Sequence, residues 1–120
     1  MIEQAMQRLK AFAILAMATL RPEITGLDVT LWVSSRAKSR HGPRVKVAKK
    51  FGNNLNFSIT ISNTPEVTSH TEKFVDKLVD GKTLQRIKRW IILNRELLLQ
   101  FWNSEITEQE LRAHIRKLPK

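Results

Sequence analysis

The stretch LNFSITIS, residues 55–62, decides the fold class, because apolar and polar side chains alternate along its whole length. Alternation with a period of two places the two sets of side chains on opposite faces of a β-strand. The stretch follows Gly52-Asn53-Asn54, residue types that favour a turn. It therefore predicts a strand with one face against a core and the other face toward water.

Two earlier segments repeat this alternation. From Leu27 to Ser34, apolar residues occupy every second position and Trp32 falls in the other set. From Arg44 to about Lys49, two valines point inward, while Arg44, Lys46 and Ala48 point outward. Three strands with short connections predict an antiparallel meander with one packed face and one wet face. Helices must cover the packed face, so we expect an α+β fold with a three-stranded antiparallel sheet.

Helical spacing of apolar residues predicts the covering layer. A first helix is expected from Glu3 to Leu20, where Pro22 stops it. A short, weak helix is expected within residues 63–81. A dominant helix follows from Lys82 to Trp102, entered after an Asp80 cap. It is apolar over more than half of its circumference, which predicts either deep burial or a homodimer contact through this helix.

Within that apolar arc, Asn94 is a polar exception. A buried amide needs hydrogen-bond partners. We expect it to cap a neighbouring loop or strand, with the fixing of a dimer register as the alternative.

The last helix has a clear start at Thr107-x-x-Glu110, the pattern of a capping box. Ile106 and Leu111 occupy the two positions of a hydrophobic staple. This helix is expected to run to about Leu118.

The composition limits the function classes. A chain of 120 residues that is 42% hydrophobic and 27% charged predicts a single globular domain, residues 1–120. Cysteine is absent, which excludes disulfides and thiolate chemistry and fits a cytoplasmic location. A net charge of +10 favours nucleic acid, an acidic protein surface or anionic lipid as partner. No apolar run approaches the roughly 18 residues of a membrane span, so we expect no membrane partner.

No complete catalytic or metal-binding constellation is visible. His41, His70 and His114 are far apart and form no metal-binding pair, so no metal and no cofactor are predicted. The group that most resembles a triad is His70 with Glu72 and Asp76, and spacing along a loop is weak support for it. An enzyme, such as a nuclease, is therefore the third hypothesis.

The most one-sided charge lies between Arg36 and Lys50, where seven Lys or Arg residues and His41 occur without an acid. We divide this block into an arm up to Pro43 and a strand after it. On the outward strand face, a platform is expected from Trp32, Arg44, Lys46, Asn56, Ser58 and Thr60. Cations there would bind phosphate, and the tryptophan ring would stack on a base. The alternative is an ordinary solvated sheet face.

A second basic line, Lys82, Arg86 and Arg89, follows the first half of the dominant helix and either extends the platform or is a solvated helix face. The candidate nucleic-acid-binding residues are Trp32, Arg36, Lys38, Arg40, His41, Arg44, Lys46, Lys49, Lys50, Arg86 and Arg89.

Two motifs, RHGPRVKV at residues 40–47 and NRELL at residues 94–98 within 91–102, resemble a bacterial family of small domains of unknown function. Its members often stand beside a second small protein in toxin–antitoxin-like gene pairs. The similarity covers about residues 27–103. The family carries P-H-x-H-V where this chain has Pro43-Arg44-Val45-Lys46-Val47. A metal or acid–base role of those histidines therefore does not carry over. The exchange to Arg44 and Lys46 keeps an outward basic pair, which suggests binding rather than chemistry.

Together these features predict a small, basic, non-enzymatic protein that binds nucleic acid or a nucleoprotein through a sheet face and an arm. The alternative is a protein-interaction module with an acidic partner. Such a module would be a toxin–antitoxin component or an inhibitor from a phage or mobile element that acts on a host-defence complex, in the manner of an anti-CRISPR protein.

Overall fold

A four-stranded antiparallel sheet forms the centre of the protein. The computed structural model describes residues 17–35, 42–48, 56–68 and 72–119. The strands are β1 (Met17–Leu20), β2 (Thr30–Ser34), β3 (Arg44–Ala48) and β4 (Phe57–Thr60), in this spatial order. The described helices are α2 (Pro22–Thr25), α3 (Glu72–Leu78), α4 (Gly81–Leu93), α5 (Arg95–Trp102) and α6 (Glu108–His114). The predicted α+β class is confirmed, whereas the predicted number of three strands is wrong.

The additional strand is β1, which lies in the segment expected to end the first helix. Thr19 pairs with Trp32, and Ala18 and Leu20 are fully buried. The four residues Met17–Leu20 also fit the apolar spacing of a helix, and pairing with β2 overrides that local preference. The remainder of the predicted helix, residues 3–16, lies outside the described residues. After β1, Pro22 takes a first-turn position in α2, where its missing N–H costs nothing.

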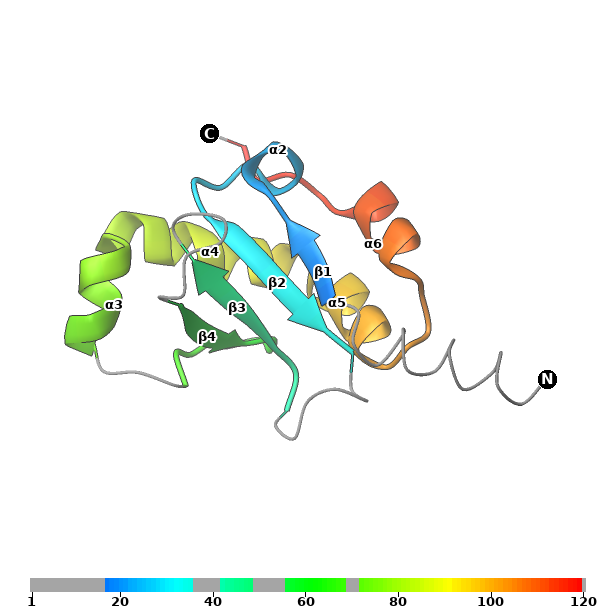
Figure 1. Ribbon diagram of the computed structural model, residues 1–120, viewed down its shortest axis with the longest axis horizontal. Helices are drawn as coiled ribbons and strands as arrows, with labels where there is room; N and C mark the ends of the chain where they lie inside the picture. Colours follow the sequence, from blue (N-terminus) through cyan, green and yellow to red (C-terminus); the bar gives the residue numbers. More distant parts are fainter. Residues whose placement is uncertain (1–16, 36–41, 49–55, 69–71, 120) are drawn as a thin grey trace, which may run out of the picture.

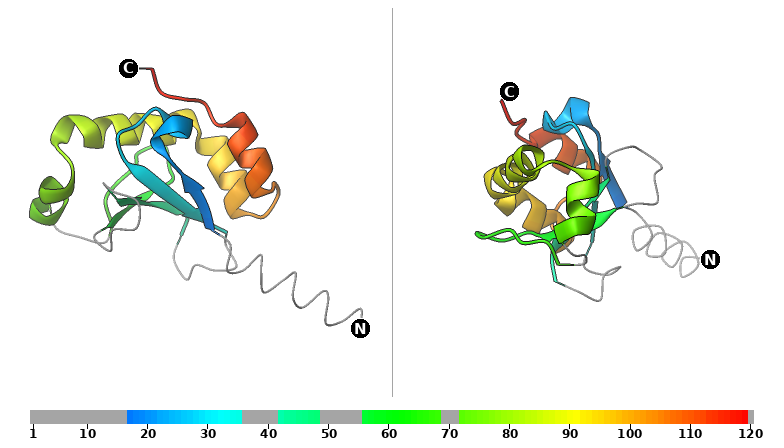
Figure 2. Two further views of the ribbon diagram at one scale, coloured as in Figure 1. Left: turned by 45° about the horizontal axis from the view of Figure 1, so that its top comes forward. Right: turned by 90° about the vertical axis from the view of Figure 1, so that its left-hand side faces the viewer.

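One face of the sheet forms the core, as the alternating pattern predicts. The side chains on this face have no exposed area, and they are Ala18, Leu20, Leu31, Val33, Val45, Val47, Phe57 and Ile59. Helices α4, α5 and α6 lie on this side of the sheet (Figures 1 and 2). They contribute Ile87, Trp90, Leu98 and Leu111 to the same core. None of the described helices is both long enough and apolar enough to cross a membrane.

The predicted dominant helix is two helices, because the chain departs from helical geometry at Asn94. Asp80 caps α4 as expected, its Oδ1 accepting from the Thr83 N–H at 2.6 Å. Helix α4 ends at Leu93, and α5 begins at Arg95. Asn94 has φ −108° and ψ 15°, and its Nδ2 donates to the Trp90 carbonyl. An asparagine side chain that bonds nearby backbone competes with the helix, which explains the break. The expected short helix before α4 is confirmed as α3.

The side chain of Asn94 also holds the C-terminal segment. Its Oδ1 accepts from the Arg116 N–H at 2.8 Å, and its Nδ2 donates to the Arg116 carbonyl at 3.0 Å. Farther along, the Leu118 N–H donates to the Thr25 carbonyl at 2.9 Å. These bonds need an extended backbone, so the prediction that the last helix runs to Leu118 is wrong: α6 ends at His114. The prediction that Asn94 caps a neighbouring segment is confirmed.

Gly26 allows the C-terminal segment to approach α2 closely. Its φ is +80°, in the left-handed region that favours glycine. A Cβ atom at this position would lie 2.5 Å from the Leu118 carbonyl oxygen, closer than any stable contact. The end of the chain is thus packed against the connection between β1 and β2.

Removal of the α6 cap is expected to lower the free energy of unfolding by about 1 kcal/mol. Thr107 Oγ1 accepts from the Glu110 N–H at 3.1 Å, and Glu110 Oε1 accepts from the Thr107 N–H at 3.0 Å, so the predicted capping box is confirmed. Thr107→Ala removes the first of these bonds, and urea denaturation measures the loss. Thr68→Ala, an exposed position outside the helices, is the control. Equal stability of the two variants would contradict the role of the cap.

Candidate nucleic-acid interface

The face of the sheet opposite the core carries a cross-strand row centred on Trp32 and Lys46. Thr19 pairs with Trp32, Trp32 with Lys46, and Lys46 with Ser58. Directly opposed residues of antiparallel strands have Cβ atoms about 5 Å apart, so the Trp32 and Lys46 side chains leave the sheet at adjacent positions. Trp32 is half-buried and Lys46 is exposed. The sheet therefore brings an aromatic side chain and a cationic side chain to adjacent positions on one face.

Arg44 adds a second cation to this face. It lies two residues before Lys46 on β3, so both side chains project from the same face. It pairs with Thr60 on β4, and both residues are half-buried. Ser34, half-buried at the end of β2, lies on the same face. Hydroxyl groups thus flank the two cations on the neighbouring strands, where they can donate to phosphate or sugar oxygens.

The four described strands contain no Asp or Glu, which leaves the positive charge of this face without internal neutralisation. An acid occurs at the β4 edge, where the Thr60 N–H donates to the carbonyl of Glu66. Glu66 also donates its own N–H to Thr60 Oγ1 at 3.0 Å. The basic part of the face therefore ends at this edge, and its two described cations, Arg44 and Lys46, both lie on β3.

Part of the predicted platform is not accessible. Ser58 is only 4% exposed and Ala48 is fully buried, so the expectation that both face water is wrong. Thr30, which pairs with Ala48, is also buried. Alternation predicts the face on which a side chain lies but not whether that face is covered. Of the other residues in the predicted platform, Lys46 is exposed, and Trp32, Arg44, Asn56 and Thr60 are half-buried.

Thr19 and Ser34 also belong to this face, although the platform was predicted without them. Thr19 was missed because β1 was expected to be helical. The signal that identifies it is the alternation of buried Ala18 and Leu20 around it. Within the platform, Trp32, Asn56 and Ser58 each have an interaction partner.

Six of the predicted site residues lie outside the described residues. They are the arm residues Arg36, Lys38, Arg40 and His41, together with Lys49 and Lys50 after β3. In the chain, the arm lies between β2 and β3, the strands that carry Trp32 and Arg44, whereas Lys49 and Lys50 lie between β3 and β4.

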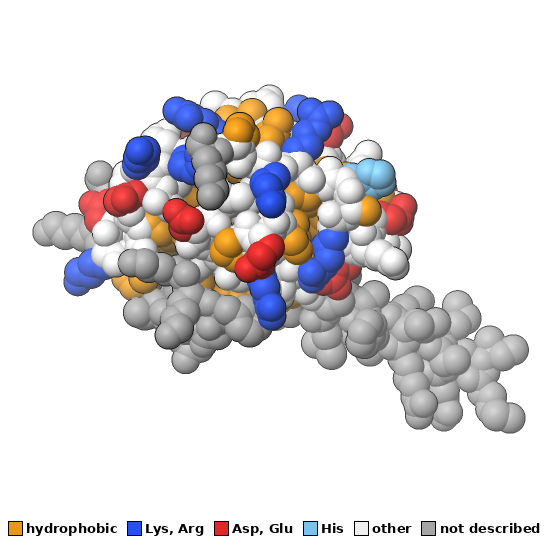
Figure 3. Space-filling view, turned by 90° about the horizontal axis from the view of Figure 1, so that it is seen from above, with side chains coloured by type: hydrophobic (Ala, Val, Ile, Leu, Met, Phe, Trp, Pro, Cys, Tyr) orange, Lys and Arg blue, Asp and Glu red, His pale blue; other side chains and the backbone are white. Residues whose placement is uncertain are grey.

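The predicted helical line does not extend the platform. Helix α4 packs on the core face of the sheet, and Lys82 and Arg89 are exposed on the helical side. Arg86 is half-buried, and its guanidinium donates to the Pro119 carbonyl at 3.0 Å and the Gly26 carbonyl at 3.2 Å. Arg86 thus ties α4 to the C-terminal segment with one donor and to the connection between β1 and β2 with the other. Figure 3, which shows the side where α2 and α6 lie, has Lys and Arg interspersed with Asp and Glu.

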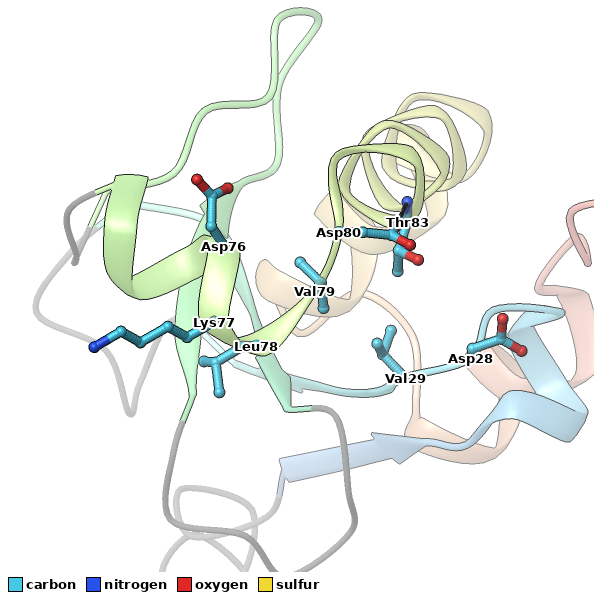
Figure 4. A pocket seen from close by; sticks show the side chains of 8 residues that line it. All are labelled: Asp28, Val29, Asp76, Lys77, Leu78, Val79, Asp80 and Thr83. Carbon is cyan, nitrogen blue, oxygen red and sulfur yellow. Dashed lines mark hydrogen bonds between the residues drawn. The ribbon is translucent and has the colours of Figure 1, made fainter.

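An acidic pocket of about 400 Å³ lies between the start of β2 and the α3–α4 connection. Asp28, Asp76 and Asp80 line it, and the Asp80 carboxylate is occupied as the α4 cap. Asp28 and Asp76 lie on opposite sides of the pocket (Figure 4). Within the described part of the chain, no group of three acids or histidines could hold a metal ion. His70, the histidine of the triad-like group, lies outside the described residues.

Comparison with known proteins found no matching family model, no matching curated protein and no matching solved structure. The resemblance of residues 27–103 to a family of small bacterial domains therefore stays a prediction.

Proposed function

We propose that this protein is a non-enzymatic nucleic-acid-binding protein that holds a single strand against the outer face of its sheet. The observation that carries the proposal is the direct pairing of Trp32 with Lys46, two residues from Arg44, on strands that contain no acid. A single strand fits better than a duplex, because stacking on an aromatic ring requires an unstacked base.

Each part of the face would make a different contact. Lys46 and Arg44 would pair with successive phosphates and release counterions, which supplies most of the affinity. The Trp32 ring would stack on one base regardless of its identity. Hydroxyls of Ser34 and Thr60 would bond sugar or phosphate oxygens. These contacts carry little sequence information, so we expect binding with low sequence preference.

Titration of a labelled mixed-sequence oligonucleotide with the full chain at roughly 50 mM salt, followed by fluorescence anisotropy, tests the proposal. Saturable binding that weakens with salt is expected. No measurable binding under these conditions would contradict the proposal. It would favour the alternative, a module that binds an acidic protein, and a stoichiometric partner should then co-purify with the chain from its source cells.

Replacement of Trp32 by alanine is expected to weaken oligonucleotide binding about 10-fold, because stacking on one base contributes about 1 to 3 kcal/mol. Trp32→Phe keeps an aromatic face and should bind within about 3-fold of the wild type. The same anisotropy titration measures both variants. Thermal unfolding checks that each is folded, since Trp32 is half-buried. If both variants weakened binding equally, the size and shape of the Trp32 side chain, rather than its stacking on a base, would account for its contribution to affinity.

A further inference from the structure

Two large apolar side chains are exposed at the end of α4. Ile92 is 49% exposed and Leu93 is 40% exposed, and they are adjacent in the last turn before Asn94. The opposite side of the same helix is buried through Ile87, Trp90 and Ile91. Single exposed apolar residues are ordinary, whereas a pair that protrudes from one helix face is a candidate contact surface. Their surroundings decide which partner fits.

The residues that flank this pair form a symmetric pattern. Arg89 lies three residues before Ile92, and Glu96 lies three residues after Leu93. Gln85 and Gln100 each lie four residues farther out, and all four polar residues are exposed. Spacings of three and four keep Gln85, Arg89 and Ile92 on one side of α4, and Glu96 and Gln100 on one side of α5. When the pattern is read from both ends, Ile92 corresponds to Leu93, Arg89 to Glu96 and Gln85 to Gln100. Each apolar residue therefore matches an apolar residue, the cation matches the anion, and each amide matches an amide.

We propose that this surface, defined as Gln85, Arg89, Ile92, Leu93, Glu96 and Gln100, binds a second copy of this chain in antiparallel orientation. A two-fold contact is self-complementary: if residue i touches residue j, then j touches i. Ile92 then packs on Leu93 of the other copy. Arg89 pairs with Glu96 of the other copy, and this pair occurs twice. A parallel contact would instead oppose arginine to arginine.

Both charged groups are available for this contact. Arg89 makes no ion pair with any described residue and is exposed. Glu96 meets the Arg95 guanidinium at 3.4 Å, and its side chain is 84% exposed. An exposed pair of this kind contributes little, so Glu96 can exchange its partner at small cost. Opposite charges across the two-fold axis then fix the register of the contact.

The position of Asn94 accounts for the exposure of the apolar pair. Its side chain is bonded to the C-terminal segment on the inner side of the helix break, which leaves Ile92 and Leu93 on the outer side. The apolar area is small compared with the roughly 800 Å² per partner of a stable complex. We therefore expect a dimer that dissociates in the micromolar range and is populated at high local concentration.

Sedimentation velocity from about 1 to 500 µM protein, without nucleic acid, tests the contact separately from the proposed function. The wild type is expected to shift from monomer to dimer across this range. Ile92→Ser combined with Leu93→Ser should stay monomeric, and Ala113→Ser, an exposed position on α6, should behave as the wild type. A wild type that stays monomeric at 500 µM overturns the proposal and favours a different protein as the partner of this surface.

Charge exchange tests the antiparallel register. Arg89→Glu alone and Glu96→Arg alone each place like charges across the two-fold axis, so each should associate at least 10-fold more weakly than the wild type. Mixing the two single variants restores both opposite-charge pairs and should restore a dimer, as should combining the substitutions in one chain. Thermal unfolding confirms that each variant is folded. Failure of the mixture to dimerise while the wild type does so overturns the register.

Discussion

Replacing Asn94 with alanine is expected to lower the free energy of unfolding by about 2 to 4 kcal/mol, the largest stability loss from a polar residue that we predict. The side chain is 3% exposed and makes three hydrogen bonds, one to the Trp90 carbonyl and two to the backbone of Arg116. Alanine leaves the N–H and the carbonyl of Arg116 without these partners. The cost therefore includes backbone groups as well as the lost amide.

Urea denaturation measures this loss, and Asn103→Ala is the matched control. Asn103 follows α5, is exposed and bonds through its backbone N–H, so its substitution should change stability by less than about 0.5 kcal/mol. Hydrogen exchange at the Arg116 amide provides a local readout and should accelerate in Asn94→Ala alone. If Asn94→Ala were as stable as the control, the C-terminal segment would not depend on this residue.

The second large effect concerns the sheet face. Replacing Arg44 and Lys46 together with serine is expected to weaken oligonucleotide binding roughly 50- to 100-fold at 50 mM salt, because two phosphate contacts are lost. Lys46 is exposed and Arg44 is half-buried, and neither makes an ion pair with a described residue. The free energy of unfolding should therefore change by less than about 1 kcal/mol. A large loss of stability would show that these residues are structural.

A control with the same change in net charge separates local contacts from general attraction. Lys82→Ser with Arg116→Ser removes two exposed cations from α4 and the C-terminal segment, away from the outer sheet face. Distant charges are partly screened, so this variant should bind within about 3-fold of the wild type. Equal weakening by both double variants would mean that the chain binds through its overall charge.

The sheet could be predicted from the sequence where alternation is continuous. Strands β2, β3 and β4 and the outward direction of Arg44 and Lys46 follow from a period of two, and the α6 cap follows from a local pattern that its own residues complete. Strand β1 could not be found in this way. Its four residues fit either a helix or a strand, and the choice depends on pairing with residues 31–34.

The same distinction between local and distant contacts explains the other differences between the predicted and the observed structure. Helical spacing places Arg86 on a basic line but does not show that the carbonyls of Gly26 and Pro119 lie within reach. The partner of the buried Asn94 side chain, the backbone of Arg116, lies 22 residues away in the chain. The burial of Ser58 depends on what covers the outer face of the sheet. The alternation of residues within β4 carries no information about that cover.

The central claim is that phosphates bind at Arg44 and Lys46, and the salt dependence of oligonucleotide affinity tests it most directly. If about four phosphates are engaged, the logarithm of the wild-type affinity should fall with the logarithm of salt concentration at a slope near −2.8 for a single strand. The Arg44→Ser, Lys46→Ser variant should give a slope near −1.4, because two of those contacts are absent. Equal slopes for the two proteins, or no binding of the wild type at roughly 50 mM salt, would contradict the claim.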